Sequence, residues 1–280
     1  SSGRSVVDAS LIEWYKESTM REPVEKRGAN KEYWIWEYPN HNKDYVIAAD
    51  VARGDGRDKS AFHVFDVEGV KQVAEFKGEV ETKDFGNLLV AVASEFNGAL
   101  LVVENANIGW AVLQQIIDKG YNNLYYTQRD YQYIDEFAQH TNKLNRMEKK
   151  QVPGFTTSIK TRPLIISKME SYVREKEVEI YSERTLDELF TFVWQGQRAE
   201  AMQGYNDDLV MSLCISLWVR DTALRFRNEN VQTQKSLFDY MGSTTNMGAG
   251  ENFLNSGLKT NPYEMKNPHG GTESLDWLLK

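Results

Sequence analysis

The sequence predicts an α/β fold in which a central mixed β-sheet is flanked by helices. Three observations support this class. Short runs rich in β-branched and aromatic residues first follow one another through tight turns, as antiparallel strands do. Amphipathic segments, with apolar residues three and four positions apart, then alternate with further apolar runs. One run, 99–103, is continuously apolar, which is typical of a central strand covered on both faces.

The predicted elements follow that order along the chain. Two strands, 46–49 and 61–65, flank a turn rich in glycine and charge, and a strand at 70–76 completes an antiparallel meander. A helix over 85–96 then precedes the central strand. The remaining expected elements are helices at 109–118, 163–175, 182–193 and 204–218, and strands at 124–126 and 178–181.

Composition and domain organisation are those of a globular protein. The 280 residues can bury a substantial core, and 41% of them are hydrophobic and 26% charged. We expect an N-terminal lead-in or tether at 1–43, one domain at 44–226 and a polar, partly disordered tail at 227–280. No apolar run is long enough for a membrane helix. Cys214 is the single cysteine, which excludes a disulfide within the chain and fits a reducing cytoplasm.

Acidic residues recur where predicted apolar elements begin or end. Asp50 ends the first strand, Glu104 ends the central strand, and Asp207 and Asp208 open the last helix. If the first strand lies beside a parallel fourth strand, as in ribonuclease-H-like folds, Asp50 and Glu104 meet at one sheet edge with the last helix against them. Taken singly, each acid also fits an ordinary role as a helix cap or turn residue. Taken together, they favour a metal site.

The chemistry of such a site follows from its ligands. Crowded carboxylates repel one another unless a cation neutralises them, and their hard oxygens select Mg²⁺ or Mn²⁺. Two ions about 3.5–4 Å apart clamp the attacking and leaving oxygens of a phosphoryl displacement. We therefore predict two ions held by Asp50, Glu104 and either Asp207 or Asp208, with Asp50 bridging. Asp58 is a further candidate ligand, and the pattern leaves open which of Asp207 and Asp208 is the direct one.

A basic segment points to nucleic acid. Between 141 and 168, seven Lys and Arg residues face one Glu, an excess of 7 − 1 = +6 in a chain of net charge −8. Contacts to phosphates position DNA without reading its bases. The alternative is an ordinary solvated loop. The predicted contacts to the DNA backbone are Arg53, Arg57, Lys143, Arg146, Lys149, Lys150, Lys160, Arg162 and Lys168.

Three separated motifs resemble the nuclease domain of the large terminases of tailed phages, most closely the T4-like ones. The motifs are Ala49-Asp50 with Gly54 and Asp58-Lys59-Ser60-Ala61, then Val103-Glu104-Asn105, then Gly204-Tyr205-Asn206-Asp207-Asp208-Leu209-Val210-Met211-Ser212-Leu213. They span about 44–222 and occur in the family's order. By this resemblance Asp50, Glu104 and Asp208 match three catalytic acids, and Asp58 matches a further acid near the site.

The resemblance implies a ribonuclease-H-like (RuvC-like) fold and a metal-dependent endonuclease that cuts concatemeric viral double-stranded DNA during genome packaging. It implies a location in the host cell cytoplasm. The implied partners are double-stranded DNA, a packaging ATPase domain, the portal protein and the small terminase subunit, with no membrane. The chain lacks the Gly-x-x-x-x-Gly-Lys-Ser/Thr phosphate loop, so we expect an isolated nuclease portion that does not translocate DNA alone.

Other functions remain compatible with the pattern. One is an actin-like nucleotide phosphotransferase, which shares the core fold, although a second Gly-rich phosphate hairpin is missing from the sequence. Another is a Holliday-junction resolvase with the same metal chemistry. The third is a non-catalytic module that docks on a portal or motor partner, with its acids serving as caps.

Overall fold

The computed structural model describes residues 4–52, 59–106, 108–128 and 151–221, and the backbone of 264–266 and 272–274. The chain divides into two compact units, residues 1–222 and 223–280. What is described of the second unit is an antiparallel pair of strands, β12 (Glu264–Lys266) and β13 (Thr272–Ser274), in the region predicted as a polar tail. No described helix is long and apolar enough to cross a membrane.

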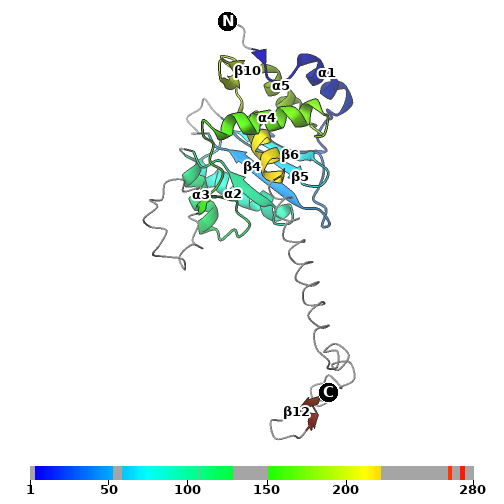
Figure 1. Cartoon of the computed structure of the whole chain (residues 1–280), viewed down its shortest axis with the longest axis vertical. Coiled ribbons are helices and arrows are strands. Elements are labelled where there is room, and N and C mark those ends of the chain that lie inside the picture. Colours follow the sequence, from blue (N-terminus) through cyan, green and yellow to red (C-terminus); the bar gives the residue numbers. More distant parts are fainter. Residues whose placement is uncertain are drawn as a thin grey trace, which may run out of the picture. The chain divides into compact units, whose positions relative to one another are not determined.

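The first unit is built on a six-stranded mixed sheet with the strand order β2-β3-β6-β5-β4-β7 (Figure 1). Its strands are β2 (Glu25–Arg27), β3 (Tyr33–Ile35), β4 (Tyr45–Asp50), β5 (Ser60–Asp66), β6 (Lys71–Gly78) and β7 (Leu100–Val103). Strands β4, β5 and β6 form the predicted antiparallel meander, and β4 pairs in parallel with β7. Both the meander and the parallel pairing of the first and fourth predicted strands are therefore confirmed.

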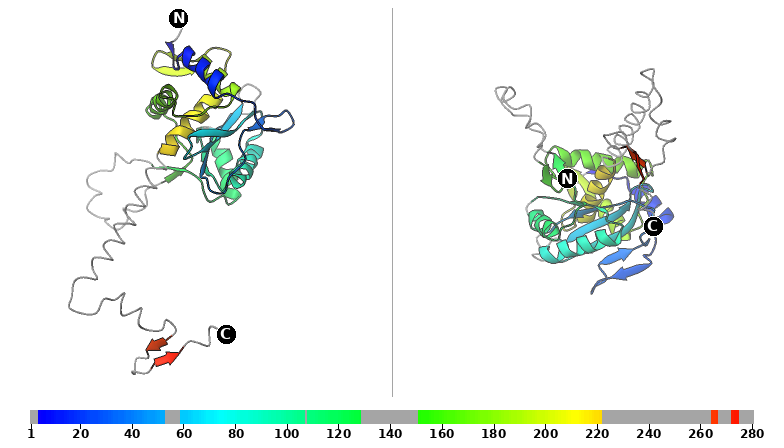
Figure 2. Two further views of the ribbon diagram at one scale, coloured as in Figure 1. Left: turned by 90° about the vertical axis from the view of Figure 1, so that its right-hand side faces the viewer. Right: turned by 90° about the horizontal axis from the view of Figure 1, so that it is seen from below.

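Helices cover both faces of this sheet (Figures 1 and 2). Two of them, α2 (Thr82–Glu95) and α3 (Gly109–Asp118), pack on the face to which β4 contributes Ile47 and Ala49. Successive strand residues point to opposite faces, so Ala48 and Asp50 belong to the other face. That face carries α5 (Glu183–Thr191) and a helix over 208–221, with α4 (Thr161–Arg174) packed against the latter.

The N-terminal segment differs from the lead-in that the sequence predicted. Strands β2 and β3 extend the main sheet, and β1 (Arg4–Ser5) pairs with β10 (Phe192–Gln195) in a second, three-stranded sheet that ends in β11 (Arg198–Ala201). Helix α1 (Ala9–Ser18) buries Ile12 and Tyr15. The Tyr15 hydroxyl donates to the carbonyl of Val178 at 3.0 Å. These buried apolar residues make the segment part of the first unit.

Two further elements also differ from expectation. The predicted helix to residue 193 ends at Thr191, because the aromatic and β-branched residues that follow pair as strand β10, and Gly196 turns the chain at φ +67°. The predicted strand at 178–181 is reduced to a single parallel bridge between Lys71 and Glu179. Between the predicted strand at 124–126 and the predicted helix at 163–175, β8 (Tyr126–Gln128) pairs with β9 (Gln151–Pro153).

Candidate active site

Two predicted acids emerge side by side from neighbouring parallel strands. Strand β4 ends at Asp50, and Glu104 follows the last residue of β7. The register pairs Ala49 with Val103, and the Glu104 amide donates to the Ala49 carbonyl at 3.0 Å. The carboxyl ends of parallel strands meet at the same sheet edge, and here the two carboxyl groups share a hydrogen bond.

The helix over 208–221 brings a third acid toward this pair. The Ser212 hydroxyl donates to the Ala48 carbonyl at 3.0 Å, which fixes the helix across β4. Asp208 lies four residues, or just over one turn, before Ser212, about 6 Å along the helix axis. Asp50 lies two residues beyond Ala48, about 6.6 Å along the strand. Asp208 and Asp50 therefore both lie near the sheet edge where Glu104 ends β7.

The electrostatics of the pair show that negative charge is crowded there. Burial raises the pKa of Asp50 well above its ordinary value, and repulsion by Glu104 and a hydrogen bond that protonated Asp50 donates to it raise the pKa further. The charges of Asp208 and Asp207 act in the same direction. Burial also raises the pKa of Asp207, although its ion pair with Arg162 opposes the shift. A cation near Asp50 and Glu104 would relieve this repulsion.

The donors suit a hard divalent cation, but the predicted cluster is only partly assembled. Among the residues that the structure describes, no group of three or more His, Cys, Asp or Glu side chains has the arrangement of a metal site. The carboxyl groups of Asp50 and Glu104 contact each other, whereas Asp207 and Asp208 affect the pKa of Asp50 through their charges. Mg²⁺ is commonly held by one or two carboxylates, with waters and substrate phosphates completing its shell, so the pair fits this ion. Asp58 lies outside the described residues.

The alternative that Glu104 caps the following helix does not fit the structure. The residue before α3 is Ile108, and the N-terminus of that helix has no side-chain cap. The next side chain, Asn105, is 5% exposed and donates to the Pro153 carbonyl at 3.0 Å and to the Thr156 hydroxyl at 2.9 Å. These bonds fix the backbone beside Glu104 and leave its carboxylate facing a cavity.

A buried glutamate that sequence reasoning missed holds the start of the 208–221 helix. Glu188 on α5 accepts hydrogen bonds from the amides of Leu209 at 2.8 Å and Val210 at 3.2 Å, and its other oxygen is paired with Lys77. The ring of His63 donates to the Leu209 carbonyl at 3.0 Å. The available signal was a glutamate on the apolar face of a predicted helix, between Leu186 and Leu189.

Arg162, predicted to contact DNA, instead anchors the residue before Asp208. Its Nη2 lies 2.8 Å from Asp207 Oδ2 and 3.3 Å from the Ala199 carbonyl, so it joins α4, β11 and the last helix. Of the other predicted contacts, Lys168 pairs with Asp221 at 2.6 Å, and Lys160 is exposed where α4 begins. The rest of the predicted set lies outside the described residues: Arg53, Arg57, Lys143, Arg146, Lys149 and Lys150.

Arg162→Ala is expected to lower the free energy of unfolding by about 1–3 kcal/mol, because it leaves the partly buried carboxylate of Asp207 without its charged partner. Urea unfolding at pH 7 measures the change. The matched control is Arg174→Ala, which breaks an exposed pair with Glu170 and should cost less than about 1 kcal/mol. Equal losses in the two variants would show that Arg162 does not anchor this site.

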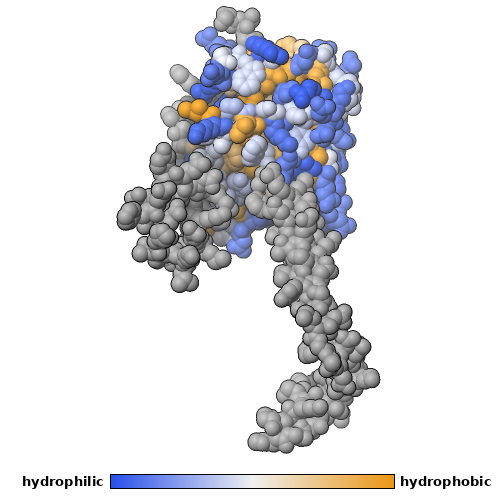
Figure 3. Space-filling model, viewed as in Figure 1, coloured by the Kyte–Doolittle hydropathy of each residue, from blue (hydrophilic) through white to orange (hydrophobic). Residues whose placement is uncertain are grey.

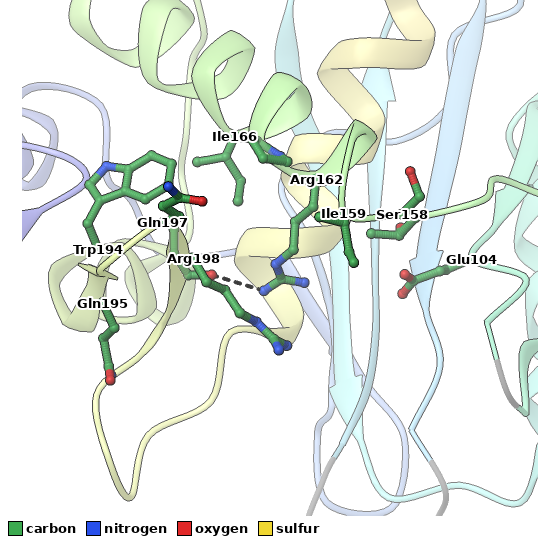
Figure 4. A pocket seen from close by; sticks show the side chains of 12 residues that line it. Glu104, Ser158, Ile159, Arg162, Ile166, Trp194, Gln195, Gln197 and Arg198 are labelled. Carbon is green, nitrogen blue, oxygen red and sulfur yellow. Dashed lines mark hydrogen bonds between the residues drawn. The ribbon is translucent and has the colours of Figure 1, made fainter.

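A cavity of about 640 Å³ opens beside Glu104 (Figure 4). Arg162 comes from α4, while Trp194 and Arg198 come from the hairpin formed by β10 and β11. In Figure 4 the two arginines lie between Trp194 on one side and Glu104 on the other. The sequence prediction missed this wall because it continued the preceding helix into β10.

Comparison with known proteins supports the fold. No protein-family model matches the sequence. Among solved structures, the large terminase nuclease of thermophilic phage G20c with bound magnesium is 18% identical, with a TM-score of 0.56, over 78% of this chain and 98% of that chain. Its form with bound cobalt is 19% identical, with a TM-score of 0.56 and the same coverage. The large terminase nuclease domain of Thermus phage P74-26 is 19% identical, with a TM-score of 0.53, over 74% and 93%.

These likenesses, together with the mixed sheet and its parallel β4–β7 pair, identify the architecture. The chain therefore has the ribonuclease-H-like α/β fold of the large terminase nuclease domains, as its three motifs predicted.

Proposed function

We propose that the chain is a divalent-metal-dependent endonuclease that cuts double-stranded viral DNA during genome packaging. The observation that carries the proposal is the Asp50–Glu104 carboxyl pair at the edge of the sheet, with Asp208 brought toward it by the last helix. The fold is that of large terminase nucleases, including one with magnesium bound. Such a cluster suits the hydrolysis of phosphodiesters because a metal ion held by it can stabilise the charge that develops on phosphate oxygens.

Each residue has a proposed role at this site. Asp50 and Glu104 hold the metal, and Asp208 completes the ligand set, with Asp58 as a further candidate. Asp207 is committed to Arg162 and therefore orients the helix start. A bound Mg²⁺ or Mn²⁺ supplies Lewis-acid stabilisation and lowers the pKa of a bound water. We propose two ions, because the charge of several carboxylates at one sheet edge exceeds what one divalent ion neutralises.

Cleavage of supercoiled plasmid DNA tests the proposal. We expect nicked and linear products with Mg²⁺ or Mn²⁺ and none with EDTA. ATP hydrolysis without DNA cleavage would instead favour the actin-like phosphotransferase, and a strong preference for four-way junctions would favour a resolvase. If no metal supports cleavage and calorimetry detects no Mn²⁺ binding, the endonuclease proposal is wrong. The proposed partners, namely the packaging ATPase domain, the portal protein and the small terminase subunit, are tested separately by pull-down.

Gly109→Ala is expected to reduce the rate of cleavage by displacing Glu104. A Cβ at position 109 would lie 1.8 Å from the Glu104 carbonyl oxygen, so the backbone that carries this ligand must move. A misplacement of about 1 Å in a catalytic group can cost about 100-fold in rate. The measurement is the turnover number for plasmid nicking at saturating Mg²⁺.

Gly86→Ala is the control for this prediction. Its Cβ would crowd Gln115 at 2.9 Å, across the interface between α2 and α3, but would not touch Glu104. We expect this control to lose stability while its folded fraction cuts at the wild-type rate. If Gly109→Ala also cuts at that rate, the position of Glu104 does not limit the reaction.

A further inference from the structure

The cavity beside Glu104, formed between the start of α4 and the β10–β11 hairpin, is here named the α4–hairpin cavity. Its walls combine cationic, amide and apolar side chains around a volume of about 640 Å³. The lining residues used below are Thr157, Ile159, Arg162, Trp194, Gln197 and Arg198. The cavity shares Glu104 with the proposed metal site, so a ligand inside it would lie next to the reacting phosphate.

The positive side chains of this cavity suit a phosphate group. Arg198 has a side chain that is 69% exposed, and its contact with Glu200, at 3.4 Å, is a weak surface pair. Arg162 places a second guanidinium at the cavity, although this one is already paired with Asp207 (Figure 4). The Arg162 Nε atom and the Thr157 hydroxyl oxygen are buried without a hydrogen-bond partner among the described residues, and both residues line the cavity. Such unused polar groups favour a polar ligand that can bond to them after a small side-chain adjustment.

The apolar walls suit a nucleobase rather than phosphate alone. Trp194 presents an indole ring, and Ile159 is 95% exposed although its side chain is wholly apolar. The outer face that carries α4 likewise mixes hydrophobic with hydrophilic side chains (Figure 3). Aromatic rings stack with any base, and amides such as that of Gln197 can bond to base edges. A groove that bound only the DNA backbone would not need these residues.

The size of the cavity indicates whether single-stranded or double-stranded DNA can enter it. A sphere of 640 Å³ is about 11 Å across. A B-form duplex is wider than this cavity, because its major groove alone is about 12 Å wide and its minor groove about 6 Å wide. The volume falls within the range of about 300–1,000 Å³ that is usual for small-ligand pockets. A single nucleotide is therefore the part of a DNA substrate that can enter.

We propose that the α4–hairpin cavity binds one unpaired nucleotide of the DNA strand that is being cut, with its base against Trp194 and a phosphate at Arg198. The nuclease therefore engages DNA that is locally unpaired beside the metal site. This inference rests on the proposed endonuclease function and adds to it a single-strand subsite. Removing a base from the duplex costs a few kcal/mol, which such stacking offsets.

Fluorescence anisotropy with labelled DNA tests the proposal. The protein carries Asp50→Asn with Mg²⁺ present, which is intended to keep the probes intact. The probes are a 12-nucleotide oligothymidine and a blunt 12-base-pair duplex. Adding Trp194→Ala is expected to weaken binding of the single strand by about 5- to 100-fold and to leave duplex affinity within about twofold. Trp194→Phe should retain most of the single-strand affinity, because it keeps an aromatic face.

Two further variants sharpen the result. Arg198→Ala should weaken single-strand binding and reduce the magnitude of the slope of log affinity against log salt by about 0.7, the value for one phosphate contact. Trp110→Ala, on α3 and 46% exposed, does not line the cavity and should change nothing. Melting curves establish that each variant is folded.

The outcomes separate the two proposals. The single-nucleotide subsite would be overturned if Trp194→Ala lost equal affinity for the single strand and the duplex. It would also be overturned if the variant were folded and lost no affinity for the single strand. The endonuclease proposal would stand in either case as long as the wild-type protein cuts plasmid with Mg²⁺. Absence of any metal-dependent cleavage would instead refute the endonuclease proposal on which the subsite depends.

Discussion

Asp50→Asn is expected to lower the rate of Mg²⁺-dependent plasmid cleavage by about 10²–10³-fold or more. The substitution removes the carboxylate that all the neighbouring acids crowd, and with it the charge that would hold the metal against the reacting phosphate. Glu104→Gln should have a similar effect, because its carboxyl shares the hydrogen bond with Asp50. Initial rates of plasmid nicking at several Mg²⁺ concentrations measure both losses.

A second readout separates a metal ligand from a structural residue. Burial, together with the neighbouring acids, raises the pKa of Asp50, so its ionised form opposes folding, and stability without metal should fall as the pH rises from the ordinary range of an Asp toward the raised pKa. Asp50→Asn removes that repulsion. With EDTA at pH 8 we therefore expect the variant to melt at a higher temperature than the wild type.

Bound metal should reverse the order of the melting temperatures of wild type and Asp50→Asn. Mg²⁺ is expected to raise the melting temperature of the wild type but not that of Asp50→Asn. Asp187→Asn, which alters an exposed acid paired with Lys16, is the control that should change neither activity nor the response to metal. Wild-type cleavage rates in both Asp50→Asn and Glu104→Gln would exclude the carboxyl pair as the catalytic centre.

Arg184→Ala is expected to give the largest loss of stability, about 3–5 kcal/mol at pH 7. Its guanidinium lies 2.7 Å from the carboxylate of Glu75, which is fully buried under α5. Thr185 and Gln72 also donate to this carboxylate. Without Arg184 a buried negative charge loses its main counter-ion, which is why the expected cost exceeds that of a surface pair.

The loss should depend on pH in a defined direction. Burial acts to raise the pKa of Glu75, but Arg184, His63 and the hydrogen bonds outweigh it and hold that pKa below its ordinary value. The wild-type carboxylate therefore adds stability above its ordinary pKa, and this contribution is lost as the pH falls through the lowered one. In Arg184→Ala the penalty should be largest near pH 7 and shrink as the pH falls, because Glu75 without Arg184 takes up a proton at a higher pH than it does in the wild type.

Urea unfolding of wild type and variant at pH 7 and pH 4 measures this difference. The control is Lys16→Ala, which breaks an exposed ion pair with Asp187 and should cost less than about 1 kcal/mol at both values. A penalty for Arg184→Ala that is small, or equal at both pH values, would contradict a role for Arg184 as the counter-ion of Glu75.

The network around Glu75 also connects the core to the site. Gln72 donates to the ring of His63 at 2.9 Å, and His63 in turn donates to the carbonyl of Leu209, next to Asp208. None of these polar residues stands out in the sequence, because their burial depends on strands and helices far apart in the chain. Sequence reasoning therefore named the acids of the proposed metal site but missed the groups that hold them in place.

The assignment of Arg162 shows the same limit. A run of basic residues predicts a surface for phosphate, because net local charge can be counted from the sequence. Whether one arginine in that run faces solvent or an acid depends on which later segment of the chain packs beside it. Here the later segment places Asp207 Oδ2 2.8 Å from Arg162 Nη2. Arg198 is the only Arg or Lys residue between 192 and 207, and the sequence analysis did not single it out as a contact, yet it is exposed at the cavity.

By itself, the sequence determined the meander, its parallel fourth strand and the placing of Asp50 and Glu104 at strand ends. The meander and the strand ends follow from local periodicity and turn chemistry, whereas the parallel fourth strand was expected from the arrangement of ribonuclease-H-like folds. Only the tertiary structure decided that residues 4–43 belong to the first unit and that β10 and β11 form a wall beside Glu104. Those outcomes depend on pairing between segments distant in sequence, such as β1 with β10, for which short-range patterns carry no signal.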